Sequence, residues 1–113
     1  MQQNPEDNGR KGFFEEVHDL VAIIPPGKVM TYGQIASHLG GARSAKIVGF
    51  AMACAPDGRN LPCHRVINRL GEMAKGNTFG GKELQRALLE EEGVLFLANG
   101  RVDLMQSRFE PEW

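Results

Sequence analysis

The sequence has few cysteines and no long apolar run, and these absences exclude several classes of protein. The apolar runs, such as residues 21–24, are far too short to span a bilayer, and the polar N-terminus has no signal-peptide core. We therefore expect a cytoplasmic protein with no membrane partner. The two cysteines, Cys54 and Cys63, have no further cysteine or histidine at zinc-finger spacing. We expect two free thiols, with Cys54 in the core, no metal site and no cofactor.

The length and the charge distribution suggest one domain with a basic face. The chain has 113 residues, which fits a single domain with a modest core. We predict a disordered tail over residues 1–9 and a single monomeric domain over residues 10–113. The net charge of −1 conceals an asymmetry, because residues 27–82 contain eight basic but only two acidic residues. A basic middle between acidic ends indicates a face that meets an anion, although a solvated surface with chance clustering is the alternative.

Three helices are predicted in the first half of the chain. Apolar residues recur at helical spacing over residues 13–24, with Asn8 as a candidate N-cap and His18 on the surface. Thr31 and Gln34 form a capping box that begins a second helix, which should run to about Leu39. After a glycine break, a third helix is expected from Ser44 to about residue 54. Two short helices joined in this way are typical of a helix-turn-helix motif, and an ordinary helical hairpin is the alternative.

The second half of the chain combines one helix with turns and short strands. Residues 66–67 and 73–74 are predicted to form a short hairpin, at the position that a wing would occupy. Residues 82–92 read as a helix with Leu84, Ala87 and Leu88 on the inner side. Residues 94–98 and 101–105 flank an Asn-Gly pair, which is typical of a type I′ hairpin turn. The predicted fold class is therefore mainly α with short β-hairpins, in a winged helix-turn-helix-like DNA-binding arrangement.

The most informative stretch joins a thiol, an imidazole and a guanidinium. Cys63 is followed by His64 and Arg65, and Pro62 restricts the backbone before it. The thiolate is the nucleophilic form of cysteine, and a neighbouring base raises its population. A bare Cys-His pair is weak evidence for chemistry, because most cysteines are buried small hydrophobes. The surrounding sequence is needed to interpret it.

Five short stretches together resemble a known family. They are Thr-Tyr-Gly-Gln-Ile-Ala at 31–36, Val-Gly at 48–49, Pro-Cys-His-Arg-Val-Ile-Asn at 62–68, Gly-Gly at 80–81 and Glu-Gly at 92–93. This pattern resembles the C-terminal domain of O6-alkylguanine-DNA alkyltransferases over roughly residues 13–97, without the family's usual N-terminal domain. In size the chain is similar to alkyltransferase-like proteins, which bind alkylated guanine without repairing it and usually carry tryptophan at the position of Cys63.

The resemblance implies a mechanism and a set of site residues. A helix-turn-helix would flip the damaged base out of duplex DNA from the minor groove, and Cys63 would accept the alkyl group irreversibly. The implied catalytic residues are Cys63, His64, Glu92 and Tyr32. The implied DNA-binding residues are Thr31, Tyr32, Arg43, Ser44, Lys46, Gly49 and Arg65. The implied base pocket consists of Pro62, Val66, Thr78, Phe79 and Gly80. The expected partner is double-stranded DNA that contains O6-alkylguanine.

Two positions depart from the family pattern and leave two functions open. Lys46 stands where the family has an arginine that fills the gap left by the flipped base, and Arg43 is a possible substitute. Ala55 stands where an asparagine braces the nucleophile loop. The first function is single-turnover alkyl transfer to Cys63. The alternative is a non-enzymatic protein that binds the lesion and signals to other repair proteins.

Overall fold

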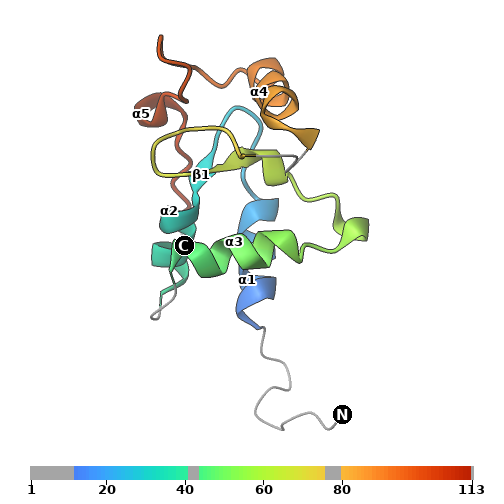
Figure 1. The fold of residues 1–113 in the computed structure, drawn as a ribbon. Helices are drawn as coiled ribbons and strands as arrows, with labels where there is room; N and C mark the ends of the chain where they lie inside the picture. Colours follow the sequence, from blue (N-terminus) through green and yellow to red (C-terminus); the bar gives the residue numbers. More distant parts are fainter. Residues whose placement is uncertain (1–11, 41–43, 76–79, 113) are drawn as a thin grey trace, which may run out of the picture.

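The computed structural model describes residues 12–40, 44–75 and 80–112, and within them the chain is mainly helical (Figure 1). The predicted tail over residues 1–9 lies outside these ranges. In chain order the elements are α1 (Phe13–Ala22), β1 (Met30–Thr31), α2 (Tyr32–Leu39), α3 (Ala45–Ala53), the 3₁₀ helices η2 (Asp57–Arg59) and η3 (Cys63–Arg65), β2 (Val66–Ile67), α4 (Lys82–Glu91) and α5 (Leu104–Ser107). The predicted class is confirmed, and within the described residues no helix is both long and apolar enough to cross a bilayer.

Helix α1 forms one wall of the core and differs from its prediction at both ends. It begins at Phe13 with Gly12 at the N-cap position and ends at Ala22, whereas the predicted cap, Asn8, lies outside the described residues. The prediction of a surface His18 was wrong. Its side chain is buried, and its Nε2 lies 2.6 Å from the carbonyl oxygen of Ala51 in α3. This hydrogen bond explains why a polar ring is tolerated inside, since a buried polar group is costly only without a partner.

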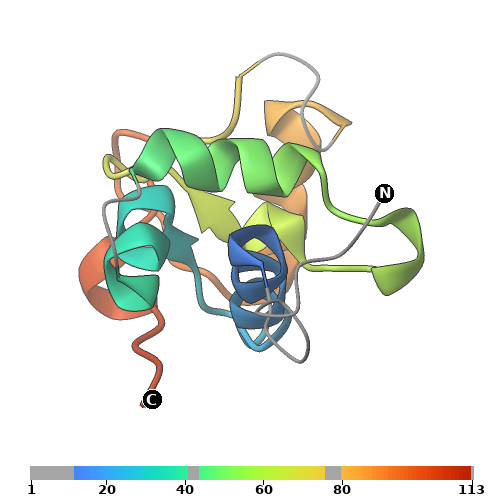
Figure 2. The same ribbon diagram turned by 90° about the horizontal axis from the view of Figure 1, so that it is seen from below.

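The helix-turn-helix pair is formed by α2 and α3, which pack against each other and against α1 (Figure 2). The capping box at the start of α2 is confirmed, because the Thr31 side chain accepts a hydrogen bond from Gln34 N. Gly40 ends α2 with a φ of 77°, a conformation that favours glycine. Ser44 stands at the N-cap of α3, but its side chain makes no capping hydrogen bond.

The two short strands pair in parallel, which corrects the predicted wing. Val66–Ile67 was expected to pair with residues 73–74, but β2 pairs instead with β1, with Met30 opposite Val66. A parallel bridge between Val29 and Arg108 continues this arrangement on the other side of the β1 segment. The C-terminal segment is therefore fixed to the body of the domain. The segments around residues 30 and 108 therefore lie side by side, although they are far apart in the sequence.

The C-terminal hairpin is shorter than predicted and uses a different turn. Phe96 and Val102 form an antiparallel bridge, and α5 begins at Leu104, where a strand was expected. The loop is closed by Leu97 N, which donates to Arg101 O, with Gly100 at a φ of 88°. Asn99 is not in the positive-φ region, so the turn is not type I′ but a three-residue loop with glycine at its left-handed position.

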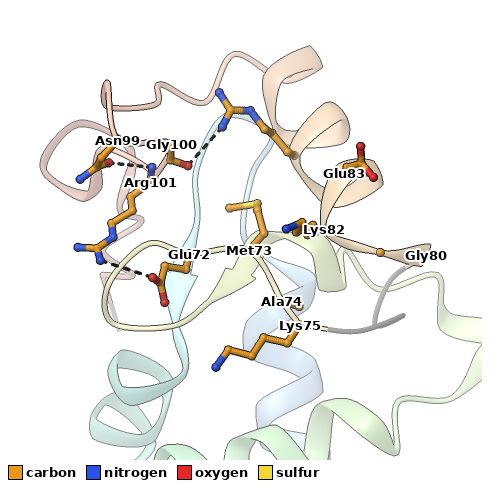
Figure 3. A pocket seen from close by; sticks show the side chains of 12 residues that line it. Glu72, Met73, Ala74, Lys75, Gly80, Lys82, Glu83, Asn99, Gly100 and Arg101 are labelled. Atoms are coloured by element: carbon orange, nitrogen blue, oxygen red, sulfur yellow. Dashed lines mark hydrogen bonds and ion pairs between the residues drawn. The ribbon is translucent and has the colours of Figure 1, made fainter.

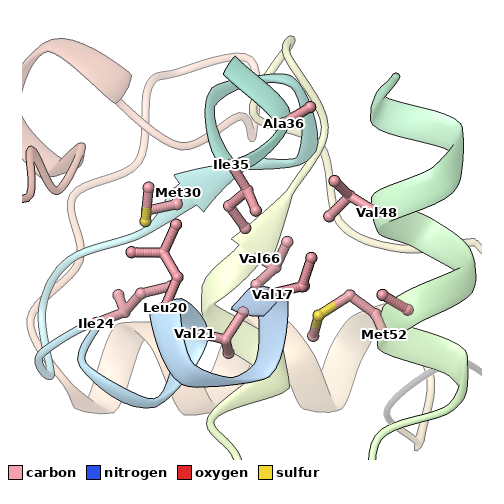
Figure 4. Packing of buried hydrophobic residues seen from close by; sticks show 11 residues of the cluster. Val17, Leu20, Val21, Ile24, Met30, Ile35, Ala36, Val48, Met52 and Val66 are labelled. Carbon is pink, nitrogen blue, oxygen red and sulfur yellow. The ribbon is translucent and has the colours of Figure 1, made fainter. Parts of the chain in front are cut away.

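The core consists of two clusters of buried side chains. The larger one joins α1, α2, α3 and the strands, as Figure 4 shows, and comprises Val17, Leu20, Val21, Ile24, Met30, Ile35, Ala36, Val48, Ala51, Met52 and Val66. The smaller cluster lies under α4 and the C-terminal hairpin and comprises Val29, Ile67, Leu89, Val94 and Val102.

Two predictions of burial were wrong. Cys54 is exposed rather than in the core, because it follows the last buried turn of α3. The buried residues of α4 are Gln85 and Leu89, whereas Leu84 and Ala87 face solvent and Leu88 is half-buried. The inner face of α4 is thus rotated by about one residue from the face that the apolar pattern indicated.

Candidate functional site around Cys63

The candidate nucleophile lies in a single tight turn. Cys63 begins η3, its backbone N donates to Leu61 O at 2.8 Å, and Arg65 N donates to Pro62 O at 2.9 Å. The Cys63 side chain is half-buried and packs against the larger core cluster. Burial raises the pKa of the Cys63 thiol above its ordinary value, because a thiolate is less well solvated there. The turn thus presents a thiol that favours its protonated form.

Glu92, at the end of α4, holds the two residues that follow Cys63. His64 Nε2 lies 2.8 Å from Glu92 Oε2, and Arg65 donates through Nε to Oε1 at 2.9 Å and through NH2 to Oε2 at 2.6 Å. The hydrogen bond from Arg65, helped by His64, lowers the pKa of Glu92 to about 2. Glu92 is therefore a carboxylate throughout the physiological range, and it can keep His64 in the tautomer that carries its proton on Nε2.

The Arg65 guanidinium is occupied by hydrogen bonds inside the protein. Besides its two contacts with Glu92, it donates through NH1 to Ile24 O at 2.8 Å, and its side chain is only 14% exposed. The prediction placed Arg65 among the DNA-binding residues. In the structure its contacts tie η3 to the segment after α1 and to the end of α4, since all three nitrogens of its guanidinium have internal acceptors.

Gln85 is a further positioning residue that the sequence did not reveal. It is fully buried on α4, and its Nε2 donates to His64 O at 3.0 Å and to Val66 O at 3.4 Å. Its Oε1 accepts from Ala74 N at 2.7 Å. One amide thus holds the backbone on both sides of Arg65, at the end of the cysteine turn, together with the segment at Ala74. The only sequence signal was its spacing of four residues from Leu89.

Tyr32 begins α2 and lines a small cavity next to β2. The cavity has a volume of about 340 Å³ and is lined by Tyr32, Val66, Ile67, Asn68, Glu72, Met73, Ala74 and Lys75. Burial raises the pKa of the Tyr32 hydroxyl, and negative charge on the nearby Cys63 raises it further. The hydroxyl therefore keeps its proton and can act as a donor beside the thiol. Of the predicted pocket residues, Val66 lies here together with Tyr32.

A second, larger cavity lies on the other side of residues 72–75 (Figure 3). It has a volume of about 1020 Å³ and shares Glu72, Met73, Ala74 and Lys75 with the smaller one. Gly80, which was predicted to line the base pocket, lines this larger cavity instead. Pro62 is not among the lining residues of either cavity. The predicted pocket residues Thr78 and Phe79 lie outside the described residues.

The segment between the two cavities is held by Asn68 and Gly71. Asn68 Oδ1 accepts from the backbone N of Leu70 at 3.0 Å and of Glu72 at 2.9 Å. Gly71 has a φ of 80°, and a Cβ there would come within 2.8 Å of Val102 O. The backbone at Gly71 therefore requires glycine, and Val102 N donates to Gly71 O at 2.8 Å. The wall of the small cavity is in this way anchored to the C-terminal hairpin.

The predicted DNA-binding residues fall into two groups. Ser44 and Lys46 are exposed at the start of α3, and Gly49 lies half-exposed one turn further along the same helix. Thr31 is buried, and its hydroxyl serves as the N-cap of α2. Arg43 lies outside the described residues. The structure thus brings Ser44, Lys46 and Gly49 together on α3, whereas the side chains of Thr31 and Arg65 have hydrogen-bond partners inside the protein.

The fold and the site together define a helix-turn-helix domain with a half-buried cysteine, whose neighbouring histidine is held by a carboxylate from another helix. Residues 12–94 match the family described as 6-O-methylguanine DNA methyltransferase, DNA binding domain. The chain belongs to this family. The resemblance that the sequence motifs indicated is thereby confirmed.

Three relatives of the chain carry different names. The DNA base-flipping protein of Escherichia coli is 41% identical over 100 residues, which cover 86% of this chain and 74% of the relative. Alkyltransferase-like protein 1 of Schizosaccharomyces pombe is 44% identical over 82 residues, with 73% and 76% covered. A methylated-DNA–protein-cysteine methyltransferase of Shigella flexneri is 41% identical over 93 residues, 82% of this chain but only 53% of the relative. The chain thus spans about half of that enzyme.

Solved structures that resemble the chain include both alkyltransferase-like proteins and methyltransferases. The crystal structure of S. pombe Atl1 with damaged DNA containing O6-carboxymethylguanine aligns with a TM-score of 0.71 and 35% identity, over 97% of this chain and all of that chain. The Mycobacterium tuberculosis OGT structure in complex with DNA aligns with a TM-score of 0.62 and 36% identity, over 73% of this chain and 49% of that one. The domain therefore has the fold of both subgroups.

Proposed function

We propose that the protein binds duplex DNA containing O6-alkylguanine, rotates the damaged base into the cavity beside Tyr32 and accepts the alkyl group on Cys63. The observation that carries this proposal is the contact between His64 and Glu92. A histidine that follows a cysteine directly, with its Nε2 held 2.8 Å from a carboxylate, is the arrangement of a nucleophile, a base and an orienting group. The likeness to proteins solved with DNA supports the choice of ligand.

The proposed transfer forms one bond and breaks one. The Cys63 sulfur attacks the alkyl carbon attached to O6, a carbon–sulfur bond forms, and the carbon–oxygen bond to guanine breaks. The thiol proton passes to His64 through a water, since Glu92 occupies Nε2 and leaves the other ring nitrogen to accept it. Glu92 stabilises the imidazolium that results. The thioether is not reversed, so each protein molecule would act once.

Tyr32 would supply the proton that the leaving purine needs. Its raised pKa keeps the hydroxyl protonated, and Tyr32 and Cys63 pack against the same core cluster. A donor beside the nucleophile neutralises negative charge on the guanine ring as the alkyl group departs. The segment at residues 72–75 would form the opposite wall of the base pocket. No cofactor enters this scheme.

Recognition without transfer is the second candidate, and two observations favour it. Burial raises the pKa of the Cys63 thiol, which lowers the population of the reactive thiolate. The alignment with S. pombe Atl1 covers that whole chain, whereas the aligned alkyltransferases are about twice as long as the matched part. In this reading the protein would hold the flipped base and mark it for other repair proteins. The two functions share the fold and the cavity and differ only in the thiol chemistry.

Intact-mass measurement separates the two candidates. The protein is incubated with a duplex oligonucleotide containing O6-methylguanine, and the expected result is the gain of one methyl group per molecule. The gain should disappear in Cys63→Ser and persist in Cys54→Ser, which removes the other thiol. Binding is measured in parallel with lesion and unmodified duplexes, and affinity should fall with salt because phosphate contacts release counterions.

Each alternative predicts a different outcome of the same experiment. Selective binding of the lesion duplex without any mass change would reject transfer and support recognition alone. Equal binding of lesion and unmodified duplexes, again without a mass change, would reject both. A methyl group located on Cys54 by peptide mapping would also contradict the assignment of Cys63.

A further inference from the structure

The outer face of α3 carries one large apolar side chain. The helix buries Val48, Ala51 and Met52, which leaves positions 46, 49, 50 and 53 on the opposite side. Gly49 and Ala53 are small, but Phe50 is not, and it is 52% exposed. A single exposed aromatic residue is common on protein surfaces and by itself proves nothing. Its position on the second helix of the helix-turn-helix pair makes it notable.

Phe50 has a cation beside it. Lys46, one helical turn earlier, places its Nζ 6.0 Å from the centre of the Phe50 ring, which is near the outer limit of a cation–π contact. Residues 44–56 contain no acidic side chain, so nothing on this stretch opposes the positive charge. The same face of α3 therefore combines a flat apolar ring with an ammonium group.

Phe50 and Lys46 together offer a flat surface and a positive charge, whereas a lysine alone offers only the charge. A protein that rotates a base out of a duplex leaves a gap in the stack, and a planar side chain that enters the gap replaces part of the lost stacking. An ammonium group offers charge but no flat surface, whereas a phenylalanine ring offers a flat surface but no charge. The two side chains are close enough in the free protein to approach one site on DNA together.

We propose that Phe50 and Lys46 act as one unit on DNA, in which the Phe50 ring stacks in the gap left by the flipped base and Lys46 contacts the adjoining phosphate. This inference rests on the proposed recognition of O6-alkylguanine but not on alkyl transfer to Cys63. It assigns Phe50 to the DNA interface, as a residue that stabilises the flipped state. It also accounts for a large apolar side chain on a helix face that is otherwise small or polar.

The test compares the affinity of Phe50→Ala for lesion and unmodified duplexes. If the ring stacks in the gap, affinity for the O6-methylguanine duplex should fall at least about fivefold, since stacking of a base on an aromatic ring is worth about 1–3 kcal/mol and 1.4 kcal/mol is tenfold. Affinity for the unmodified duplex should change little. Phe50→Trp should retain selectivity for the lesion. Lys46→Met should weaken binding to both duplexes and reduce the salt dependence, as loss of a phosphate contact requires.

Leu95→Ala is the matched control, because Leu95 is 55% exposed on the C-terminal hairpin, away from α3. It should leave both affinities unchanged, and thermal unfolding should be similar in all variants. Wild-type affinity of Phe50→Ala for the lesion duplex would overturn the inference while leaving the proposed function intact. An equal loss on both duplexes would overturn it too, because it would make Phe50 a general groove contact. Absence of lesion selectivity in the wild type would reject the proposed recognition itself.

Discussion

His64 Nε2 lies 2.8 Å from Glu92 Oε2, although 28 residues separate the two in the chain. The same carboxylate also receives two hydrogen bonds from Arg65, so consecutive residues of one 3₁₀ turn share a single anion from α4. Cys63 is the first residue of that turn. The position of Glu92 therefore determines the position of the turn that carries the candidate nucleophile.

The first prediction concerns the reactivity of Cys63 in Glu92→Gln. The amide lacks the negative charge that stabilises a protonated His64, so proton removal from the thiol should become less favourable. We expect the rate of alkyl transfer, or of Cys63 modification by a thiol reagent at pH 7, to fall about 10²-fold, the lower end of the range for general acid–base catalysis. The rate should be measured in a Cys54→Ser background. An unchanged rate would remove Glu92 from the relay.

The second prediction concerns stability and its pH dependence. Because the pKa of Glu92 is lowered to about 2 in the folded protein, its contribution is present above the ordinary value of 4.5 and is lost as the pH falls towards 2. At pH 7 Glu92→Gln should lower the free energy of unfolding by about 1.5–3 kcal/mol, the range for hydrogen bonds to a charged group. The difference from wild type should shrink between pH 4.5 and pH 2.

Urea denaturation of both proteins at pH 7, 4 and 3 measures that difference directly. Glu90→Gln is the matched control, since Glu90 lies two residues away and its ion pair with Arg86 is about half exposed. Such a surface pair contributes little, so this variant should behave like wild type. A constant difference between wild type and Glu92→Gln at all three pH values would contradict the assignment.

The third prediction concerns Gln85. Replacement by leucine keeps a similar volume but leaves His64 O, Val66 O and Ala74 N without their partner. We expect Gln85→Leu to lower the free energy of unfolding by at least about 3 kcal/mol, since three groups lose their partner and each unpaired buried polar group costs about 1–3 kcal/mol. Leu84→Ala, at the exposed neighbouring position, should change stability little. Similar stability of Gln85→Leu and wild type would show that the backbone finds other partners.

Local signals explain which parts of the fold were predictable. The capping box of Thr31 and Gln34 acts within one turn, so the start of α2 followed directly from the residues. Val66 and Ile67 have the character of a strand, but their partner is set by packing, and the sequence did not indicate the parallel pairing with Met30 and Thr31. A strand's composition shows that it is buried, not which segment lies beside it.

The candidate site also has a part that the sequence revealed and a part that it did not. Cys63 and His64 were recognisable because they are adjacent in the chain, and the resemblance supplied Glu92. The burial of Arg65, the bridging role of Gln85 and the inward position of His18 depend on hydrogen bonds between distant segments. Polar residues of this kind read as surface residues in a sequence, because only the folded chain provides the acceptors that make their burial favourable.

The fourth prediction concerns Tyr32→Phe. Loss of the hydroxyl removes the proposed proton donor but keeps the ring, so alkyl transfer should slow by about 10²-fold or more while affinity for the lesion duplex falls much less. Single-turnover transfer rates and equilibrium binding measure the two effects separately. An equal loss of rate and affinity would show that Tyr32 acts in binding only. If the protein recognises the lesion without transfer, only the binding measurement applies, and the loss of affinity should be small.

The last prediction concerns the pH at which Cys63 becomes reactive. Because burial raises the pKa of its thiol, the rate of reaction with iodoacetamide should rise at a higher pH than for a free cysteine in a peptide, whose pKa is about 8.5. The protein should carry Cys54→Ser so that only one thiol reacts, and the midpoint of the pH profile should be compared rather than the absolute rate, which also reflects access. A midpoint below that of the peptide would mean that His64 stabilises the thiolate more strongly than burial opposes it. That outcome would favour transfer over recognition alone, whereas the expected high midpoint favours recognition alone unless lesion binding itself assists removal of the proton.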